Sequence, residues 1–198
     1  MRPVPLAAKT PKNWVALALG VAVIALPGCA AHQFRQVSCQ QSRQSIFVLE
    51  AQAVPSATLI PCMGRLPLGW SYGGSDVGSG LVRFWFDSDR AGPRAIEVTM
   101  TRACDMAGAS EVYLKAAPPG LHRYEAPAER HPNATVNYFV FSGGCVTYRF
   151  GFTRRSWPDL YVDADRALGF TPRLLYVNSL HEDSGLTLCG AKAPPCGG

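Results

Sequence analysis

The sequence predicts an α+β fold that is mainly antiparallel β, a small sandwich or half-open barrel with one or two C-terminal helices. Three observations lead to this prediction. Glycine and proline together make up 35 of the 198 residues, which favours many turns and few long helices. Two parts of the chain alternate apolar and polar residues around turn formers, as β-hairpins do. Helix-start and helix-stop residues follow near the C-terminus.

The first half of the domain contains one expected strand and two expected loops. Residues 46–51 form a short apolar run and are predicted to be a strand. Residues 55–69 are rich in turn formers and are predicted to be a connection. Residues 69–80 contain five glycines and are expected to form a loop.

Two hairpins are the clearest β signals. In residues 82–87 and 96–101 apolar and polar side chains alternate, and the segment between them is rich in Asp, Gly and Pro. Residues 136–141 and 145–152 repeat this pattern around a Ser-Gly-Gly turn. Between the hairpins, Val112 and Leu114 suggest a further short strand, and the proline-rich residues 116–132 are expected to be a long exposed connection.

The C-terminal part is expected to be helical. Residues 163–169 are predicted to form a short helix that ends at Gly169. Thr171 and Pro172 then supply an N-cap and a first-turn proline, which open a second helix towards Asp183 that stops at Ser184-Gly185.

The first 29 residues have the layout of an export signal. Basic residues come first (Arg2, Lys9 and Lys12), followed by an apolar run over residues 14–26. This run is about 13 residues long, whereas a membrane-spanning helix needs about 20. The segment is therefore predicted to be a signal peptide.

Leu26-Pro27-Gly28-Cys29 resembles the lipobox of bacterial lipoproteins. Leu26 and Gly28 match the pattern, and Pro27 stands where Ala, Ser or Thr is more usual. The resemblance implies that Cys29 receives a diacylglyceryl group and becomes the first residue of the mature protein. Two acyl chains are enough for stable membrane anchoring. We therefore expect residues 1–28 to be a signal peptide, 29–44 to be the lipidated cysteine and a flexible tether, and 45–198 to be a single extracytoplasmic domain.

Removal of this leader leaves a nearly neutral chain. Three of the 19 basic residues precede Cys29, so 16 remain against 14 acidic residues. A nucleic-acid-binding surface needs a stronger cluster of positive charge. The expected partners are therefore the membrane, through the lipid on Cys29, and an envelope protein or glycan, with no nucleic acid.

The cysteine count is consistent with export. Seven cysteines are an awkward number for a secreted protein, but six remain when Cys29 carries lipid. Six thiols outside the cytoplasm indicate up to three disulfides. Fifteen pairings are possible, and the turn-rich segment between the last two cysteines favours a bond between them. The candidate disulfide cysteines are Cys39, Cys62, Cys104, Cys145, Cys189 and Cys196.

No motif indicates catalysis, a metal or a cofactor. The serines of the glycine-rich segment lack the G-x-S-x-G spacing of a hydrolase elbow. A thiol nucleophile at Cys145 needs a free thiolate, which a disulfide removes. Asp87 and Asp89 are close in sequence but lack the remaining ligands of a calcium loop, so a polar turn is the preferred interpretation.

Exposed aromatic residues are the remaining candidates for binding, because aromatic rings stack on sugars and anchor protein partners. These residues are Trp70, Tyr72, Trp85 and Trp157. For Trp70 and Trp85 the alternative is ordinary packing in the domain. The preferred function is a non-enzymatic, membrane-anchored binding or accessory lipoprotein of the cell envelope. The alternative is a small envelope hydrolase or transferase whose active site is assembled from distant residues.

Overall fold

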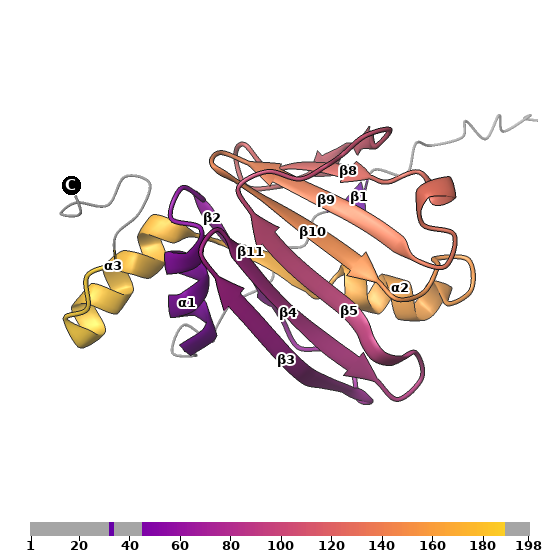
Figure 1. Cartoon of the computed structure of the whole chain (residues 1–198), viewed down its shortest axis with the longest axis horizontal. Helices are drawn as coiled ribbons and strands as arrows, with labels where there is room; N and C mark the ends of the chain where they lie inside the picture. Colours follow the sequence, from indigo (N-terminus) through magenta and orange to yellow (C-terminus); the bar gives the residue numbers. More distant parts are fainter. Residues whose placement is uncertain (1–31, 34–44, 189–198) are drawn as a thin grey trace, which may run out of the picture. The chain divides into compact units, whose positions relative to one another are not determined.

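The computed structural model describes residues 32–33 and 45–188. Its central element is a seven-stranded antiparallel sheet with the strand order β3-β4-β5-β10-β9-β8-β6 (Figure 1). The mainly antiparallel β architecture and a C-terminal helix confirm the predicted fold class. The strands of this sheet are β3 (Trp70–Gly78), β4 (Leu81–Ser88), β5 (Gly92–Thr101), β6 (Ser110–Val112), β8 (His122–Glu125), β9 (Thr135–Phe141) and β10 (Gly144–Phe150).

Both predicted hairpins are present. Strands β4 and β5 pair antiparallel, and β9 pairs with β10 across a tight turn at Ser142 and Gly143. Gly143 has a φ of +72°, and a Cβ there would lie 1.9 Å from the carbonyl oxygen of Ser56, so only glycine fits. The hydroxyl of Thr58 donates to the carbonyl of Ser142 at 2.9 Å, which holds this turn against the start of β2 (Leu59–Met63).

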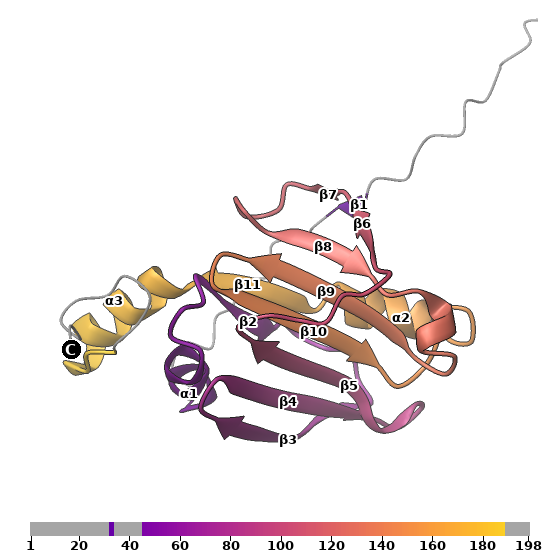
Figure 2. The ribbon, with the colours of Figure 1, turned by 45° about the horizontal axis from the view of Figure 1, so that its top comes forward.

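The main core lies on one face of the sheet. Helix α2 (Pro158–Asp165) and a two-stranded antiparallel ladder of β2 and β11 (Leu168–Pro172) cover this face (Figure 2). Aromatic rings join the layers: Phe139 and Phe170 lie 5.3 Å apart between centroids, and Phe150 and Tyr161 lie 4.8 Å apart. The core face therefore brings α2 against β9 and β10.

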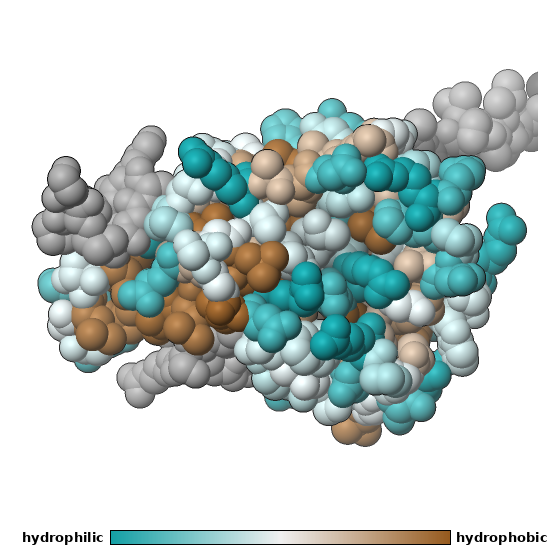
Figure 3. Space-filling view, in the orientation of Figure 1, coloured by the Kyte–Doolittle hydropathy of each residue, from teal (hydrophilic) through white to brown (hydrophobic). Residues whose placement is uncertain are grey.

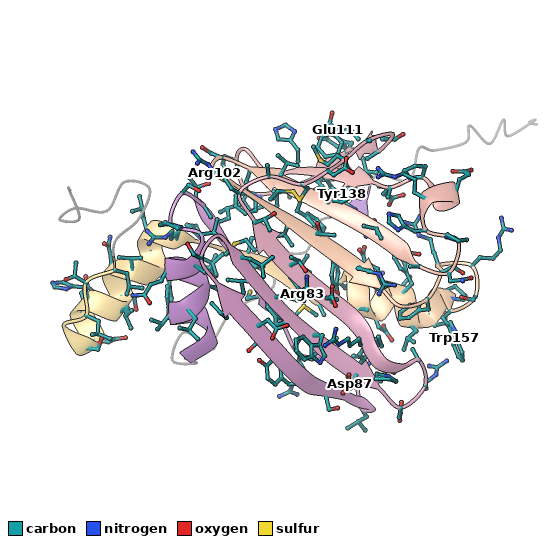
Figure 4. The ribbon with its side chains drawn as sticks, in the orientation of Figure 1. Arg83, Asp87, Arg102, Glu111, Tyr138 and Trp157 are labelled. Atoms are coloured by element: carbon teal, nitrogen blue, oxygen red, sulfur yellow. A yellow bond between two sulfur atoms is a disulfide. The ribbon has the colours of Figure 1, made fainter. Side chains whose placement is uncertain are left out.

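A smaller cluster lies on the opposite face, beside a disulfide. Cys104 follows β5 and bonds to Cys145 on β10, 41 positions further along the sequence. Cys145 is buried with Val136 and Tyr138 of β9, and Tyr138 is labelled in Figure 4. The bond thus fastens the segment after β5 to the middle of the sheet. Cys62 is also disulfide-bonded, whereas Cys29, Cys39, Cys189 and Cys196 lie outside the described residues.

The strand predicted over residues 46–51 is wrong, because the chain forms helix α1 (Ser45–Ala53) there. Glu50 and Ala51 are both buried while Leu49 is exposed, a pattern that two-residue alternation does not give. Leu, Glu, Gln and Ala are good helix formers, and burial of Glu50 and Ala51 against the domain is compatible with a helix here.

The loop predicted over residues 69–80 is also wrong. Nine of its residues form β3, which pairs with β4 and carries a bulge between Tyr72 and Gly74. The glycines have a packing role here, because a Cβ at Gly73 or Gly74 would lie within 2.6 Å of the ring of Trp85. Glycine in a strand often marks such a close approach.

Three further predictions need correction. The expected connection over residues 55–69 contains strand β2. The expected connection over residues 116–132 contains β8 and a 3-10 turn (Ala128–Arg130). The helix expected over residues 163–169 begins earlier, as α2, and ends at Asp165, and the last two residues of the predicted range begin strand β11. The last helix, α3 (Arg173–Ser184), is present and ends as predicted at Gly185, which is left-handed at φ +70°. Its predicted start is wrong by one residue, because Thr171 and Pro172 end strand β11 and Pro172 is the N-cap.

The two shortest strands lie outside the main sheet. The expected strand around Val112 and Leu114 is present as β6 and the separate β7 (Leu114–Lys115), which pairs in parallel with β1 (His32–Gln33). Among the described residues, no helix combines the length and the apolar character needed to span a membrane.

Candidate functional site

A buried group of charged side chains is the most distinctive feature of the core face. Arg123 and Glu125 alternate on β8 and so point to the same face, towards Asn137 and Phe139 of β9. Opposite them, Tyr161 and Asp165 lie one turn apart on α2. A sixth residue, Arg154, comes from the segment between β10 and α2. We call these residues the arginine–tyrosine cluster: Arg123, Glu125, Asn137, Arg154, Tyr161 and Asp165.

Arg123 lies at the centre of the cluster. Its side chain is 4% exposed, and it donates to Asp165 at 3.0 Å, to the hydroxyl of Tyr161 at 2.9 Å and to Glu125 at 3.3 Å. The guanidinium also lies over the ring of Phe139, 5.5 Å from its centroid. Burial by itself lowers the pKa of Arg123, but Asp165, Tyr161 and Glu125 together outweigh burial, and the pKa is raised. The buried positive charge is therefore paired with two carboxylates through its terminal nitrogens, whereas its buried Nε has no hydrogen-bond partner among the described residues.

The hydroxyl oxygen of Tyr161 accepts three hydrogen bonds. Besides Arg123, it accepts from Arg154 at 2.8 Å and from Asn137 at 3.2 Å. Burial raises the pKa of Tyr161, and the negative charge of Asp165 raises it further. The phenol therefore stays protonated at neutral pH and can donate towards Asp165, whose nearer oxygen lies 3.5 Å away.

The two carboxylates of the cluster are engaged by arginines. Asp165 accepts from Arg123 and from Asn137, and Glu125 accepts from Arg123 and, at 2.7 Å, from Arg154. Asp165 thus joins α2 to β8, and Glu125 joins β8 to Arg154 in the segment before α2. This pairing suits a rigid scaffold that holds neighbouring groups in place.

A pocket of about 570 Å³ opens beside this cluster. Glu125 and Arg154 form its border with the cluster, and Arg155 extends its cationic side. The imidazole of His131 also lines it, and its buried Nε2 atom has no hydrogen-bond partner among the described residues. The remaining wall is mostly apolar or hydroxyl-bearing: Ala126, Pro127, Ala128, Pro132, Ala134, Thr135, Val136 and Thr153.

The chemistry of this pocket suits an anionic group with an apolar body. One nitrogen of Arg154 is already bonded to Glu125 and Tyr161, which fixes the direction of its guanidinium. Arg155 is exposed and contributes a second positive charge. Arginine forks bind carboxylates and phosphates through paired hydrogen bonds. The pocket can therefore recognise an oxyanion against a wall of proline and alanine.

The four aromatic candidates lie in different surroundings. Trp85 is on the face of β4 opposite the core, between the glycines of β3 and the guanidinium of Arg94, which is 4.3 Å from its ring centroid. Arg83 and Asp87 flank it on the same strand (Figure 4). Trp70 is half-buried against the core, whereas Tyr72 is 55% exposed and makes an edge contact with Phe86.

Trp157 lies at the start of α2, away from β3 (Figure 4). Its ring packs against Arg90 from the turn between β4 and β5, with the guanidinium 5.3 Å from the centroid. Trp70 and Trp85 therefore have the packing roles weighed from the sequence, and Tyr72 and Trp157 keep large exposed surfaces.

The remaining sequence candidates have local roles. Asp87 accepts the backbone N–H of Arg94 at 2.8 Å, as expected for a polar turn. Cys145 is disulfide-bonded and so is not a thiol nucleophile. In residues 45–188 no three His, Cys, Asp or Glu side chains gather as a metal site would require.

Sequence reasoning missed the arginine–tyrosine cluster because Arg123 and Glu125 lie in a segment interpreted as a connection, and no element was predicted for residues 153–162, which contain Arg154 and Tyr161. The signal available was the spacing. Arg123 and Glu125 alternate within H-R-Y-E, and Tyr161 and Asp165 are four residues apart. Recognising them required β8 and α2 to be assigned first.

Comparison with known proteins gives no relative: no family model matches the sequence, and neither the curated proteins nor the solved structures contain a significant match.

Proposed function

We propose that this chain is a lipoprotein, anchored through Cys29 at the outer face of a bacterial cell membrane, that binds a component of the cell envelope. The lipobox Leu26-Pro27-Gly28-Cys29 supplies the anchor. The disulfide between Cys104 and Cys145 supports the compartment, because such bonds persist outside the reducing cytoplasm.

Binding is assigned to the pocket beside the arginine–tyrosine cluster. The observation that carries this assignment is the guanidinium of Arg154, held by Glu125 and Tyr161 at the pocket wall with Arg155 next to it. Because the buried cluster fixes Arg154 before any ligand arrives, little side-chain entropy is lost on binding. The ligand is an envelope protein or glycan that presents a carboxylate or a phosphate to this pocket.

Affinity capture from detergent-solubilised envelope tests the binding assignment. The full-length protein is compared with an Arg155→Glu variant, which reverses one charge at the pocket and leaves the hydrogen bonds of the arginine–tyrosine cluster in place. Arg149→Glu is the matched control, because Arg149 is equally a surface arginine but lies on β10, outside the pocket.

We expect the wild type and Arg149→Glu to recover the same component in equal amounts. Arg155→Glu should recover at least about ten-fold less, which corresponds to a loss of about 1.4 kcal/mol of binding free energy. Capture that is equal for all three proteins would contradict the assignment. Treatment of the captured component with phosphatase or with a carboxyl-modifying carbodiimide then tells which oxyanion is recognised.

A further inference from the structure

The two edges of the main sheet differ in how they are protected. At one edge, β6 is only three residues long and carries Glu111, which forms an ion pair with His122 on β8. At the other edge, β3 is nine residues long and, in the part of the chain that the structure describes, pairs with β4 alone. A long edge strand presents unpaired N–H and C=O groups that can pair with another strand.

Strand β3 has few of the features that normally prevent such pairing, and its bulge lies near one end, between Tyr72 and Gly74. It contains no proline and no lysine, and Asp76 is its only charged residue. Most of its residues are exposed, including the apolar side chains of Tyr72 and Val77 at 55% and 39%. Apolar residues also gather over the neighbouring helices α1 and α3 (Figure 3). They include the exposed side chains of Leu49 and Leu175.

We propose that β3 is a self-association edge, on which a second copy of this chain pairs antiparallel about a two-fold axis at Ser75. In this register Gly74 lies opposite Asp76 of the second copy. The bulged step from Tyr72 to Gly73 lies opposite Val77 of the second copy, because two residues of a bulge oppose one residue of the partner strand.

The register is complementary in shape and polarity. Tyr72 and Val77 both point to the core side of the sheet, since they pair with Phe86 and Val82 of β4. An aromatic ring beside a β-branched side chain is a favourable cross-strand pair. The two-fold axis forms this pair twice, which is the self-complementarity that a symmetric dimer requires.

The register is also complementary in charge. Asp76 makes no ion pair among the described residues, and Gly74 lies directly against the ring of Trp85. Because the guanidinium of Arg94 covers that ring at 4.3 Å, Asp76 of one copy approaches the Trp85–Arg94 stack of the other. The two Asp76 carboxylates do not face each other, so no like-charge contact opposes the pairing.

The expected interface is small. In this register residues 71–78 of the two strands overlap for about 23 Å and bury at most on the order of 1,000 Å² in total, which is the lower limit for a specific interface. The dimer is therefore weak in dilute solution. If the chain is lipid-anchored, as proposed above, confinement to a membrane raises the effective concentration of the second copy.

Cross-linking at the two-fold axis tests the pairing in the full chain. A Ser75→Cys variant places two thiols opposite each other, within the reach of a disulfide. Membranes from cells that make the protein are treated with copper phenanthroline and separated on a non-reducing gel. Ser110→Cys is the matched control, because Ser110 is an exposed serine on β6 at the other edge of the same sheet.

We expect a dimer band for Ser75→Cys and none above background for Ser110→Cys. Adding Val77→Lys should reduce the band at least about ten-fold, because a charge on an edge strand opposes pairing. Adding Val162→Lys should leave it unchanged, since Val162 is as exposed as Val77, at 40%, but lies on α2.

The light-scattering mass of the protein in detergent gives a second measurement that needs no new cysteine. We expect concentration-dependent dimerisation of the wild type that Val77→Lys removes. A Ser75→Cys band no stronger than that of Ser110→Cys, together with a wild-type mass equal to that of Val77→Lys, would overturn the proposal. Failure of the capture experiment above would not affect it.

Discussion

Arg123 on β8 donates a hydrogen bond of 3.0 Å to Asp165 at the end of α2, and both side chains are largely buried. Strand β8 and helix α2 are therefore joined by an ion pair. Removing one partner of a buried pair leaves an uncompensated charge, which costs more than the pair itself contributes. The stability of the domain should therefore depend strongly on this contact.

An Asp165→Asn substitution should destabilise the domain by about 3 kcal/mol, because it leaves the guanidinium of Arg123 only partly neutralised. Urea unfolding followed by circular dichroism measures the change. The control is His122→Gln, which removes an ion pair with Glu111 that is more than half exposed on both sides. We expect this control to unfold close to the wild type, and equal losses in the two variants would contradict the role of the buried pair.

A Glu50→Gln substitution should stabilise the domain at neutral pH. Glu50 is 2% exposed, and burial raises the pKa of its carboxyl well above the usual range. The folded protein therefore holds this proton more tightly than the unfolded chain, and the stability that it contributes at low pH is lost as the pH rises above about 4.5. Removing the ionisable group should recover on the order of 1–3 kcal/mol.

The measurement is the urea midpoint of wild type and Glu50→Gln at acidic and at slightly alkaline pH. We expect the two proteins to differ little near the ordinary pKa of glutamate and to diverge as the pH increases. A wild type that gains on the variant with rising pH would show that Glu50 is ionised and paired in the folded state.

Replacing Cys104 and Cys145 together by alanine should cost about 2–5 kcal/mol, the range found when a native disulfide is removed. The bond joins cysteines 41 positions apart, and the chain between them includes β6, β8 and β9. Proteolysis and mass spectrometry without reductant should recover one linked peptide pair that contains these two cysteines. Alkylation of either thiol in protein taken directly from cells would contradict both the bond and the exported location.

A Gly73→Ala substitution should displace Trp85, because its Cβ would lie 2.5 Å from Cδ1 of the indole. Gly78→Ala is the control on the same strand, since no atom lies within 4 Å of a Cβ at that position. We expect a changed tryptophan emission and a loss of about 1–3 kcal/mol for the first variant alone, as for an overpacked site. Indistinguishable spectra would mean that the ring does not rest on the glycines.

The hairpins could be predicted from sequence because one face of each is apolar and the other polar. In β4 and β5 every second residue enters the core, and the segment between them contains Gly92 with a φ of +83°. The end of α3 could also be predicted from the sequence, because Gly185 adopts the left-handed conformation in which helices commonly end. Local rules and tertiary packing agree in these elements.

The elements that sequence did not predict are those in which tertiary contacts override local signals. Strand β8 buries Arg123 at a position where an apolar residue is expected. The alternation of buried and exposed residues in β8 therefore cannot be recognised from hydrophobicity, because it depends on the pairing of Arg123 with Asp165. The glycines of β3 indicate a loop by composition, but Trp85 requires their missing side chains. The pocket follows from the same cluster, and no contiguous motif marks it.

The central claim is that Cys29 anchors the domain to a membrane, and the intact mass of the protein isolated from cells tests it most directly. The wild type should begin at Cys29 and carry acyl chains, with residues 1–28 removed. A Cys29→Ser variant should keep the leader and incorporate no labelled fatty acid. A wild type without lipid, or a Cys29→Ser variant that is processed in the same way as the wild type, would contradict the claim.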